Sequence, residues 1–221
     1  MFAKSFLKKK KRIIIIDFGS QVTKLIARRI RDLKVYCEII NLKELKKITS
    51  FDDIKGIILS GGPSTVTQKT YPNIPKNIFE KGIPILGICY GLQLIAKVFG
   101  GKIKKSQKKR EFGEAILLER SKSILLKNFF TNKKAKVWMS HQDAVFKIPK
   151  NFKNIASTDN SKYTVIQNKE KKIYGLQFHP EVTHTDKGFK IIKNFVLSIC
   201  KIKKNWIVGI EKRRIISNLK K

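Results

Sequence analysis

The chain has 221 residues, and 42% of them are hydrophobic, which is enough to bury the core of one compact domain. No run of about 18 apolar residues is present, and the N-terminal apolar stretch is too short for a secretory signal, so the sequence predicts neither a membrane span nor a leader. Three widely spaced cysteines, an odd number, do not form a disulfide framework. We therefore expect a reducing, cytoplasmic setting.

The charge is strongly positive, with 49 Lys and Arg residues against 16 Asp and Glu residues and a formal net charge of +33. Such an excess is typical of nucleic-acid-binding proteins. The lysines are scattered along the chain, however, and no RNP, helix-turn-helix or zinc-finger pattern is visible. We expect a solvated basic surface that binds polyanions at low salt, and no specific nucleic-acid partner.

Strand and helix patterns alternate along the first half of the chain. Residues 12–19 form an apolar run typical of a buried parallel strand, and residues 20–33 have helical spacing with Ser20 as the expected cap. The remaining expected strands cover residues 35–42, 56–62, 84–89, 114–119, 136–140 and 172–182. The remaining expected helices cover residues 73–82, which end at a glycine, 91–101 and 188–200. This order predicts an α/β fold with a mostly parallel open sheet and flanking helices.

A cysteine stands at a predicted strand-to-helix corner in the sequence GICYG, from Gly87 to Gly91. A sharp corner strains its central residue, and the two glycines remove clashes around it. This is the cysteine form of the nucleophile elbow, in which the helix N-terminus favours a thiolate at Cys89. The alternative is a small apolar residue between two turn glycines, and five residues alone do not decide between them.

The sequence His179-Pro180-Glu181 supplies a candidate base. In extended backbone, residues i and i+2 point to the same side, and Pro180 restricts His179 to extended conformations. The spacing predicts that Glu181 holds one imidazole nitrogen while the other faces Cys89. The alternative is a surface histidine with a nearby salt-bridge carboxylate.

A third feature is the predicted strand end followed by Gly61-Gly62-Pro63. Bare backbone amides in such a tight loop can stabilise an oxyanion, and the amide after the nucleophile, that of Tyr90, is the natural second donor. The alternative is a plain turn. The loop is not the S-G-G-x-D-S loop of ATP pyrophosphatases, because the aspartate is absent.

Together these motifs resemble the class I (triad) glutamine amidotransferases from about residue 12 to residue 200, and within that family the glutaminase domains of GMP synthases. The resemblance rests on the segments DFGSQ, GIILSGGPS, GICYGLQLIA, VWMSHQDAV and GLQFHPEVTHT. It implies the flavodoxin-like fold of the family. It also implies that Cys89 attacks the side-chain amide of L-glutamine, that His179 moves the proton to the departing ammonia, and that Glu181 orients His179. The implied oxyanion hole consists of the backbone amides of Gly62 and Tyr90.

The same resemblance implies glutamine-binding roles for Gln93 and for the segment 140–143, including Gln142 and Asp143. Here the sequence departs from the family, because the usual S-H-G-D motif reads S-H-Q-D. If this position has a positive φ, Gln142 is strained there, and its side chain also narrows the pocket. The affinity for glutamine is the property that this departure affects.

The resemblance implies no cofactor or metal in this chain. ATP and Mg²⁺ are expected in a synthetase (ATP pyrophosphatase) domain or subunit, which activates XMP and uses the ammonia to form GMP. We expect a basic extension over residues 1–11, the amidotransferase domain over 12–200, and a linker-like basic tail over 201–221 leading toward that partner. A fragment, a truncated gene product and one part of a split enzyme stay open as origins, and truncation is favoured.

Two other classes of function stay open: a degenerate amidotransferase that binds or regulates, and a polyanion-binding protein on an old enzyme fold. The intact Cys89, His179 and Glu181 argue against the first. Cys37 and Cys200 are expected to be core thiols.

Overall fold

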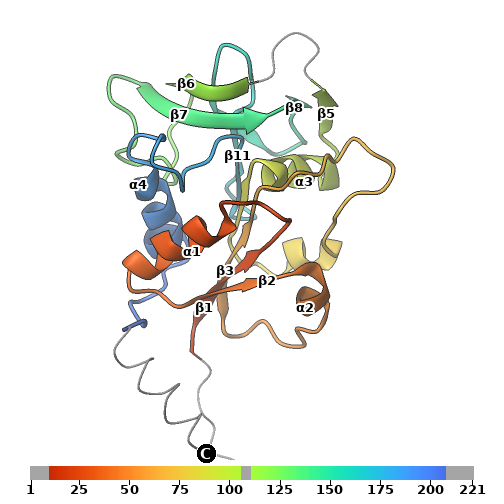
Figure 1. The fold of residues 1–221 in the computed structure, drawn as a ribbon, viewed down its shortest axis with the longest axis vertical. Coiled ribbons are helices and arrows are strands. Elements are labelled where there is room, and N and C mark those ends of the chain that lie inside the picture. Colours follow the sequence, from red (N-terminus) through yellow and green to blue (C-terminus); the bar gives the residue numbers. More distant parts are fainter. Residues whose placement is uncertain (1–9, 106–110, 208–221) are drawn as a thin grey trace, which may run out of the picture.

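The computed structural model describes residues 10–105 and 111–207 (Figure 1). The strands are β1 (Arg12–Ile16), β2 (Cys37–Ile40), β3 (Ile54–Leu59), β4 (Ile85–Ile88), β5 (Lys102–Lys105), β6 (Glu111–Glu119), β7 (Lys134–His141), β8 (Asp143–Lys147), β9 (Lys153–Ser157), β10 (Val165–Asn168) and β11 (Ile173–Leu176). The helices are α1 (Thr23–Asp32), α2 (Leu42–Lys46), the 3₁₀-helix η1 (Lys76–Glu80), α3 (Tyr90–Val98), α4 (Gly188–Lys193) and the π-helix η2 (Asn194–Ile199). Within these described ranges, no helix is long and apolar enough to cross a membrane.

One open sheet organises the described residues, with the strand order β2-β1-β3-β4-β11-β10-β9-β6-β7. Neighbouring strands among β2, β1, β3, β4 and β11 pair in parallel. From β11 onward, through β10, β9, β6 and β7, neighbouring strands pair antiparallel. Strands β5 and β8 form a separate antiparallel pair. The predicted open α/β sheet with flanking helices is confirmed, and its second half is antiparallel.

Two hydrophobic layers cover the parallel strands, because successive side chains of a strand point to opposite faces. Ile13 and Ile15 of β1 belong to the layer that includes helices α1 and α4, and Ile14 and Ile16 belong to the layer that includes α3. Figure 1 shows α1 and α4 side by side on one face of the sheet and α3 on the other. Because β1 is buried on both faces, its sequence is an unbroken apolar run from Ile13 to Ile16.

Several element boundaries differ from the sequence predictions. Helix α1 begins at Thr23, and its N-cap is Val22 rather than Ser20. The helix expected over residues 73–82 is a five-residue 3₁₀-helix that follows Pro75. The strand expected to reach His179 ends at Leu176, because its neighbour β4 ends at the paired residue Ile88.

The segment after η2 packs against the turn between α1 and β2. The Trp206 ring stacks on the Tyr36 ring at a centroid distance of 5.2 Å. Asn205 accepts a hydrogen bond from the Tyr36 amide at 2.8 Å and donates to the Lys11 carbonyl. The rest of the predicted basic tail, residues 208–221, and residues 1–9 of the predicted extension lie outside the described residues.

These contacts predict that Asn205→Ala destabilises the domain by about 1–2 kcal/mol, because both hydrogen bonds are lost. Lys204→Ala is the matched control, since Lys204 is exposed, and it is expected to change stability by less than about 0.5 kcal/mol. Chemical denaturation of the three proteins measures the difference. Equal stability of the Asn205 and Lys204 variants would contradict the described packing.

Candidate active site

Cys89 stands at the corner between β4 and α3, with φ of 52° and ψ of −103°. Both flanking glycines are sterically required. A Cβ atom at Gly87 would lie 2.5 Å from the Gly91 backbone, and one at Gly91 would lie 2.5 Å from the Leu59 carbonyl oxygen. A positive φ is costly for a residue with a side chain, so the corner holds Cys89 in a strained conformation.

His179 lies next to Glu181 in a buried pair, with 2.8 Å between Nδ1 and Oε1. This pair forms in a bent segment after β11 and not at the end of an extended strand, so the expected strand geometry was wrong although the contact is present. The His179 amide donates to the Trp138 carbonyl at 3.1 Å, and the Thr185 hydroxyl donates to the His179 carbonyl at 2.6 Å. These backbone bonds hold the bend in place.

The environment of His179 favours the charged imidazolium. Burial opposes the charge, but hydrogen bonds with Cys89 and Glu181 outweigh it and raise the pKa of His179 to about 10. Glu181 is fully buried, and within the described residues its Oε2 atom has no hydrogen-bond partner. A protonated His179 at neutral pH is the counter-ion that a Cys89 thiolate requires.

The Gly61-Gly62 loop lies against this pair of side chains. A Cβ atom at Gly61 would lie 3.1 Å from His179 Cε1 and 3.7 Å from Cys89 Cβ, and one at Gly62 would lie 2.6 Å from the Phe18 carbonyl oxygen. The loop can approach so closely only because it lacks side chains. Loop, thiol and imidazole therefore meet at one point.

The two expected oxyanion donors both lie beside Cys89. Tyr90 is the first residue of α3, where a backbone N–H has no partner within the helix. Gly62 and Tyr90 line the same cavity as Cys89. Over residues 10–105 and 111–207, neither amide donates a hydrogen bond. Both N–H groups are thus available to a bound oxygen.

The expected glutamine-binding residues also line that cavity, which has a volume of about 490 Å³; they are Gln93, Gln142 and Asp143. Gln93 Nε2 donates to the Asp143 carbonyl at 2.7 Å, and the Asp143 carboxylate accepts a hydrogen bond from the Thr65 hydroxyl. Gln142 is exposed and does not have a positive φ, so the strain considered for this position is absent.

A second cavity of about 360 Å³ also reaches Cys89, on the side lined by Gly19, Ser20, Trp138 and His179. The thiol therefore lies where two cavities meet. Within the described residues, no group of three or more His, Cys, Asp or Glu side chains is placed to hold a metal ion.

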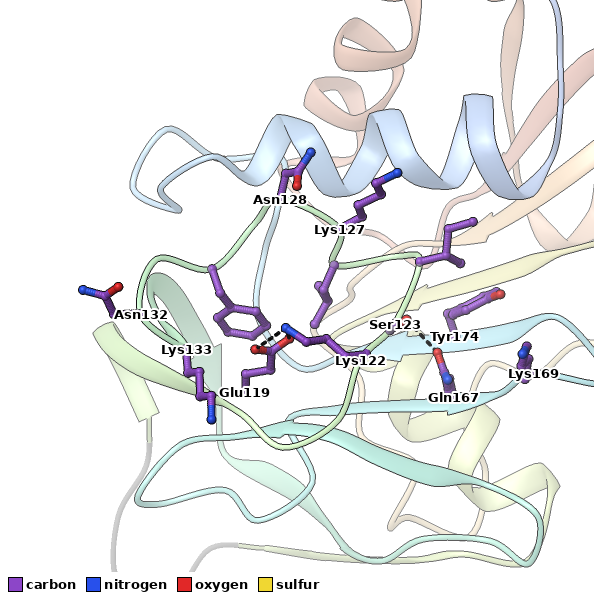
Figure 2. Close-up of a pocket in the computed structure, with 13 residues that line it drawn as sticks. Glu119, Lys122, Ser123, Lys127, Asn128, Asn132, Lys133, Gln167, Lys169 and Tyr174 are labelled. Carbon is purple, nitrogen blue, oxygen red and sulfur yellow. Dashed lines mark hydrogen bonds and ion pairs between the residues drawn. The ribbon is translucent and has the colours of Figure 1, made fainter.

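A larger cavity of about 810 Å³ lies elsewhere and contains none of the predicted site residues (Figure 2). Lys122 is paired with Glu119 there, and the amino groups of Lys127, Lys133 and Lys169 point in different directions. Convergent polar groups, which characterise a ligand site, are missing among these side chains.

The other two thiols are set apart from the site by their surroundings. Burial raises the pKa of Cys37 to about 11 and also raises the pKa of Cys200. Both side chains are free and buried, as expected for core thiols.

Sequence reasoning missed three contacts around the site. His141 Nε2 lies 2.9 Å from Glu111 Oε2, and this contact follows from the pairing of β6 with β7, which no local pattern indicates. The Thr65 contact with Asp143 likewise joins distant segments. Gln177, whose Nε2 lies 3.7 Å from Cys89 Sγ, did have a signal, since it is a polar residue inside an apolar run.

Comparisons with known proteins identify the family and the fold. The family Glutamine amidotransferase class-I matches residues 14–199, and the chain belongs to that family. The solved structure of a Thermoplasma acidophilum protein, described as one subunit of a putative GMP synthase, is similar with a TM-score of 0.73 and 30% identity, covering 87% of this chain and 94% of that one. A glutamine amidotransferase structure from Thermotoga maritima, at 20% identity and a TM-score of 0.64, shares the fold and covers 88% of this chain and 86% of that one.

Curated relatives narrow the resemblance within the family. The GMP synthase [glutamine-hydrolyzing] of Brachyspira hyodysenteriae is 47% identical over 90% of this chain and 38% of its own length. That of Aquifex aeolicus is 46% identical over 89% of this chain and 38% of its own length. The chain thus spans about 38% of the length of these relatives.

The electrostatics predict the behaviour of His179 in a titration. Removing the carboxylate that stabilises the imidazolium, in Glu181→Gln, is expected to lower the pKa of His179 by more than about one unit. Glu170→Gln is the control, because Glu170 is exposed and belongs to a different segment. NMR titration of the imidazole measures both variants, and an unchanged pKa in Glu181→Gln would contradict the role of the pair.

Proposed function

We propose that this chain is the glutaminase part of a GMP synthase, which hydrolyses L-glutamine to glutamate and ammonia through Cys89, His179 and Glu181. The observation that carries the proposal is the elbow cysteine in a strained conformation next to a buried His–Glu pair. The relatives named GMP synthase support the particular assignment. Because Cys89 has to stay a free thiol, a reducing cytoplasmic setting suits this chemistry.

In the first half of the reaction, the Cys89 thiolate attacks the side-chain amide carbon of glutamine. The carbonyl oxygen becomes an oxyanion, which the Gly62 and Tyr90 amides stabilise. The imidazolium of His179 donates its proton to the amide nitrogen, the C–N bond breaks, and ammonia leaves. A glutamyl thioester on Cys89 remains.

In the second half, His179 takes a proton from a water molecule that attacks the thioester carbonyl carbon. The tetrahedral intermediate collapses, the C–S bond breaks with its electron pair on sulfur, and glutamate leaves. Glu181 holds the imidazole orientation through both halves. Gln93, Gln142 and Asp143 line the cavity that we assign to the amino-acid end of glutamine.

The ammonia is then used for the ATP-dependent amination of XMP to GMP by a synthetase domain or subunit that lies outside these 221 residues. ATP and Mg²⁺ belong to that partner. The length of the relatives supports it, since more than half of each lies beyond the matched part.

The nucleophile assignment predicts that Cys89→Ala abolishes ammonia release from glutamine. Cys37→Ala and Cys200→Ala are matched controls, since both thiols are buried and neither residue lines the two cavities at Cys89. The two controls are expected to keep at least about half of the activity, because their thiols take no part in the chemistry. Diazo-oxo-norleucine is expected to label Cys89 alone, and labelling at another cysteine would overturn the assignment.

The proposed partner predicts coupling between the two activities. A glutaminase that hydrolyses glutamine when no acceptor for the ammonia is bound wastes glutamine. We therefore expect slow hydrolysis by this chain alone. Adding a cognate synthetase domain with ATP, Mg²⁺ and XMP is expected to raise ammonia release by tenfold or more, which requires about 1.4 kcal/mol of differential binding. Leaving out each component in turn provides the controls, and a fast rate that is independent of the partner would contradict the coupling.

We expect the partner signal to act at the mouth of the elbow, around Tyr90, the Gly62 loop and residues 181–185. Tyr90, Glu181 and Thr185 are buried. Thr183 and His184 are exposed, and the His184 ring lies 4.4 Å from the Trp138 ring beside the second cavity. We assign the partner-facing role to these two exposed residues.

A further inference from the structure

We propose that Gln177 is a catalytic residue whose side-chain amide donates a hydrogen bond to the Cys89 sulfur and stabilises its thiolate form. Gln177 Nε2 lies 3.7 Å from Cys89 Sγ. The proposal rests on the assignment of Cys89 as the nucleophile. It adds a group that acts directly on the reacting sulfur, besides the triad and the oxyanion hole.

The burial of Gln177 is the first argument. Its side chain is fully buried, and its Oε1 atom has no hydrogen-bond partner within residues 10–105 and 111–207. A buried amide that leaves its oxygen unpaired costs stability, and an apolar side chain of the same size would avoid that cost. The presence of a glutamine with an unpaired oxygen at this buried position is explained if its amide nitrogen has a function that an apolar residue cannot perform.

The backbone around this contact is fixed from both sides. The Gln177 amide donates to the Thr164 carbonyl at 2.8 Å, and the Cys89 amide donates to the Leu176 carbonyl at 2.7 Å. The end of β11 and the elbow are therefore tied together at neighbouring residues. Gln177 directly follows the last residue of β11, and its own backbone hydrogen bond fixes the position from which its side chain reaches the sulfur.

Two of the groups around the sulfur, the Ser140 carbonyl and the Gln177 amide, favour opposite protonation states of Cys89. The Ser140 carbonyl oxygen, 3.6 Å from Sγ, accepts from the S–H group and favours the thiol. The Gln177 N–H group can only donate to sulfur, so it favours the thiolate, as the imidazolium of His179 does. Gln177 thus counteracts the preference of the Ser140 carbonyl for the thiol and stabilises the thiolate that attacks the substrate.

The same contact serves the second half of the reaction. In the thioester, the sulfur carries no negative charge and accepts a hydrogen bond poorly. When water has attacked and the C–S bond breaks, the electron pair returns to sulfur. Gln177 then stabilises the leaving thiolate without moving.

The test is the pH dependence of Cys89 alkylation by iodoacetamide, followed by mass spectrometry of the Cys89 peptide. Gln177→Met removes the N–H donor at nearly constant length, and Gln177→Glu replaces the amide with a carboxylate of the same shape. We expect the midpoint of the alkylation profile to rise by about one pH unit in Gln177→Met, which is tenfold slower alkylation below the midpoint, and further in Gln177→Glu.

Gln167→Met is the matched control. Gln167 is also a buried glutamine, but it accepts a hydrogen bond from Ser123 at the larger, separate cavity. The midpoint of Cys89 alkylation in Gln167→Met is expected to equal that of the unchanged chain. Should Gln177→Met fail to fold, Gln177→Asn keeps the amide but withdraws it from the sulfur, and the same rise is expected.

An unchanged midpoint in folded Gln177 variants would overturn the proposal. The assay needs no glutamine, so it is separable from the proposed function. If the unchanged chain alkylates normally and the Gln177 variants shift, yet glutamine is never hydrolysed with or without the partner, the glutaminase proposal fails and the thiolate proposal stands.

Discussion

The crowded corner between β4 and α3 is the constraint on which the rest of the site depends. Gly91 packs against the Leu59 carbonyl oxygen and Gly87 against Gly91, so α3 can begin directly above the end of β4 only if both lack side chains. The turn then forces Cys89 to a φ of 52°, a sparsely populated conformation that costs about 1–3 kcal/mol for a residue with a side chain. Burial of helix α3 and the hydrogen bond from the Cys89 amide to the Leu176 carbonyl offset that cost. The sulfur is held above the sheet.

The parallel half of the sheet brings the other groups to the same place. The segments that follow β1, β3, β4 and β11 all emerge at the carboxyl ends of parallel neighbours, where ligands bind in open α/β sheets. They carry Ser20, Gly62, Cys89 and His179 respectively. Each part of the site therefore comes from a different strand end, and its geometry depends on the strand order. The antiparallel half adds β7, which delivers Ser140 to the sulfur.

Local patterns predicted much of this arrangement. Fully apolar runs indicated the buried parallel strands, and the glycine spacing around Cys89 indicated the corner, because both depend on residues adjacent in sequence. Contacts that depend on strand pairing were not predictable in this way. The Glu111 contact with His141 needs the register of β6 and β7, and the end of β11 depends on where β4 stops. Gln177 was visible as a polar residue in an apolar run, but its role depends on the sulfur beside it.

The central claim is that the elbow presents the Cys89 sulfur to a carbonyl group whose oxygen is received by the Gly62 and Tyr90 amides. A crystal structure of the chain after reaction with diazo-oxo-norleucine tests this most directly. We predict a covalent bond to Cys89 Sγ, with the ligand carbonyl oxygen about 2.7–3.1 Å from both amide nitrogens and the Cys89 φ still positive. An adduct whose oxygen points away from these amides, or a corner that relaxes to a negative φ, would contradict the account.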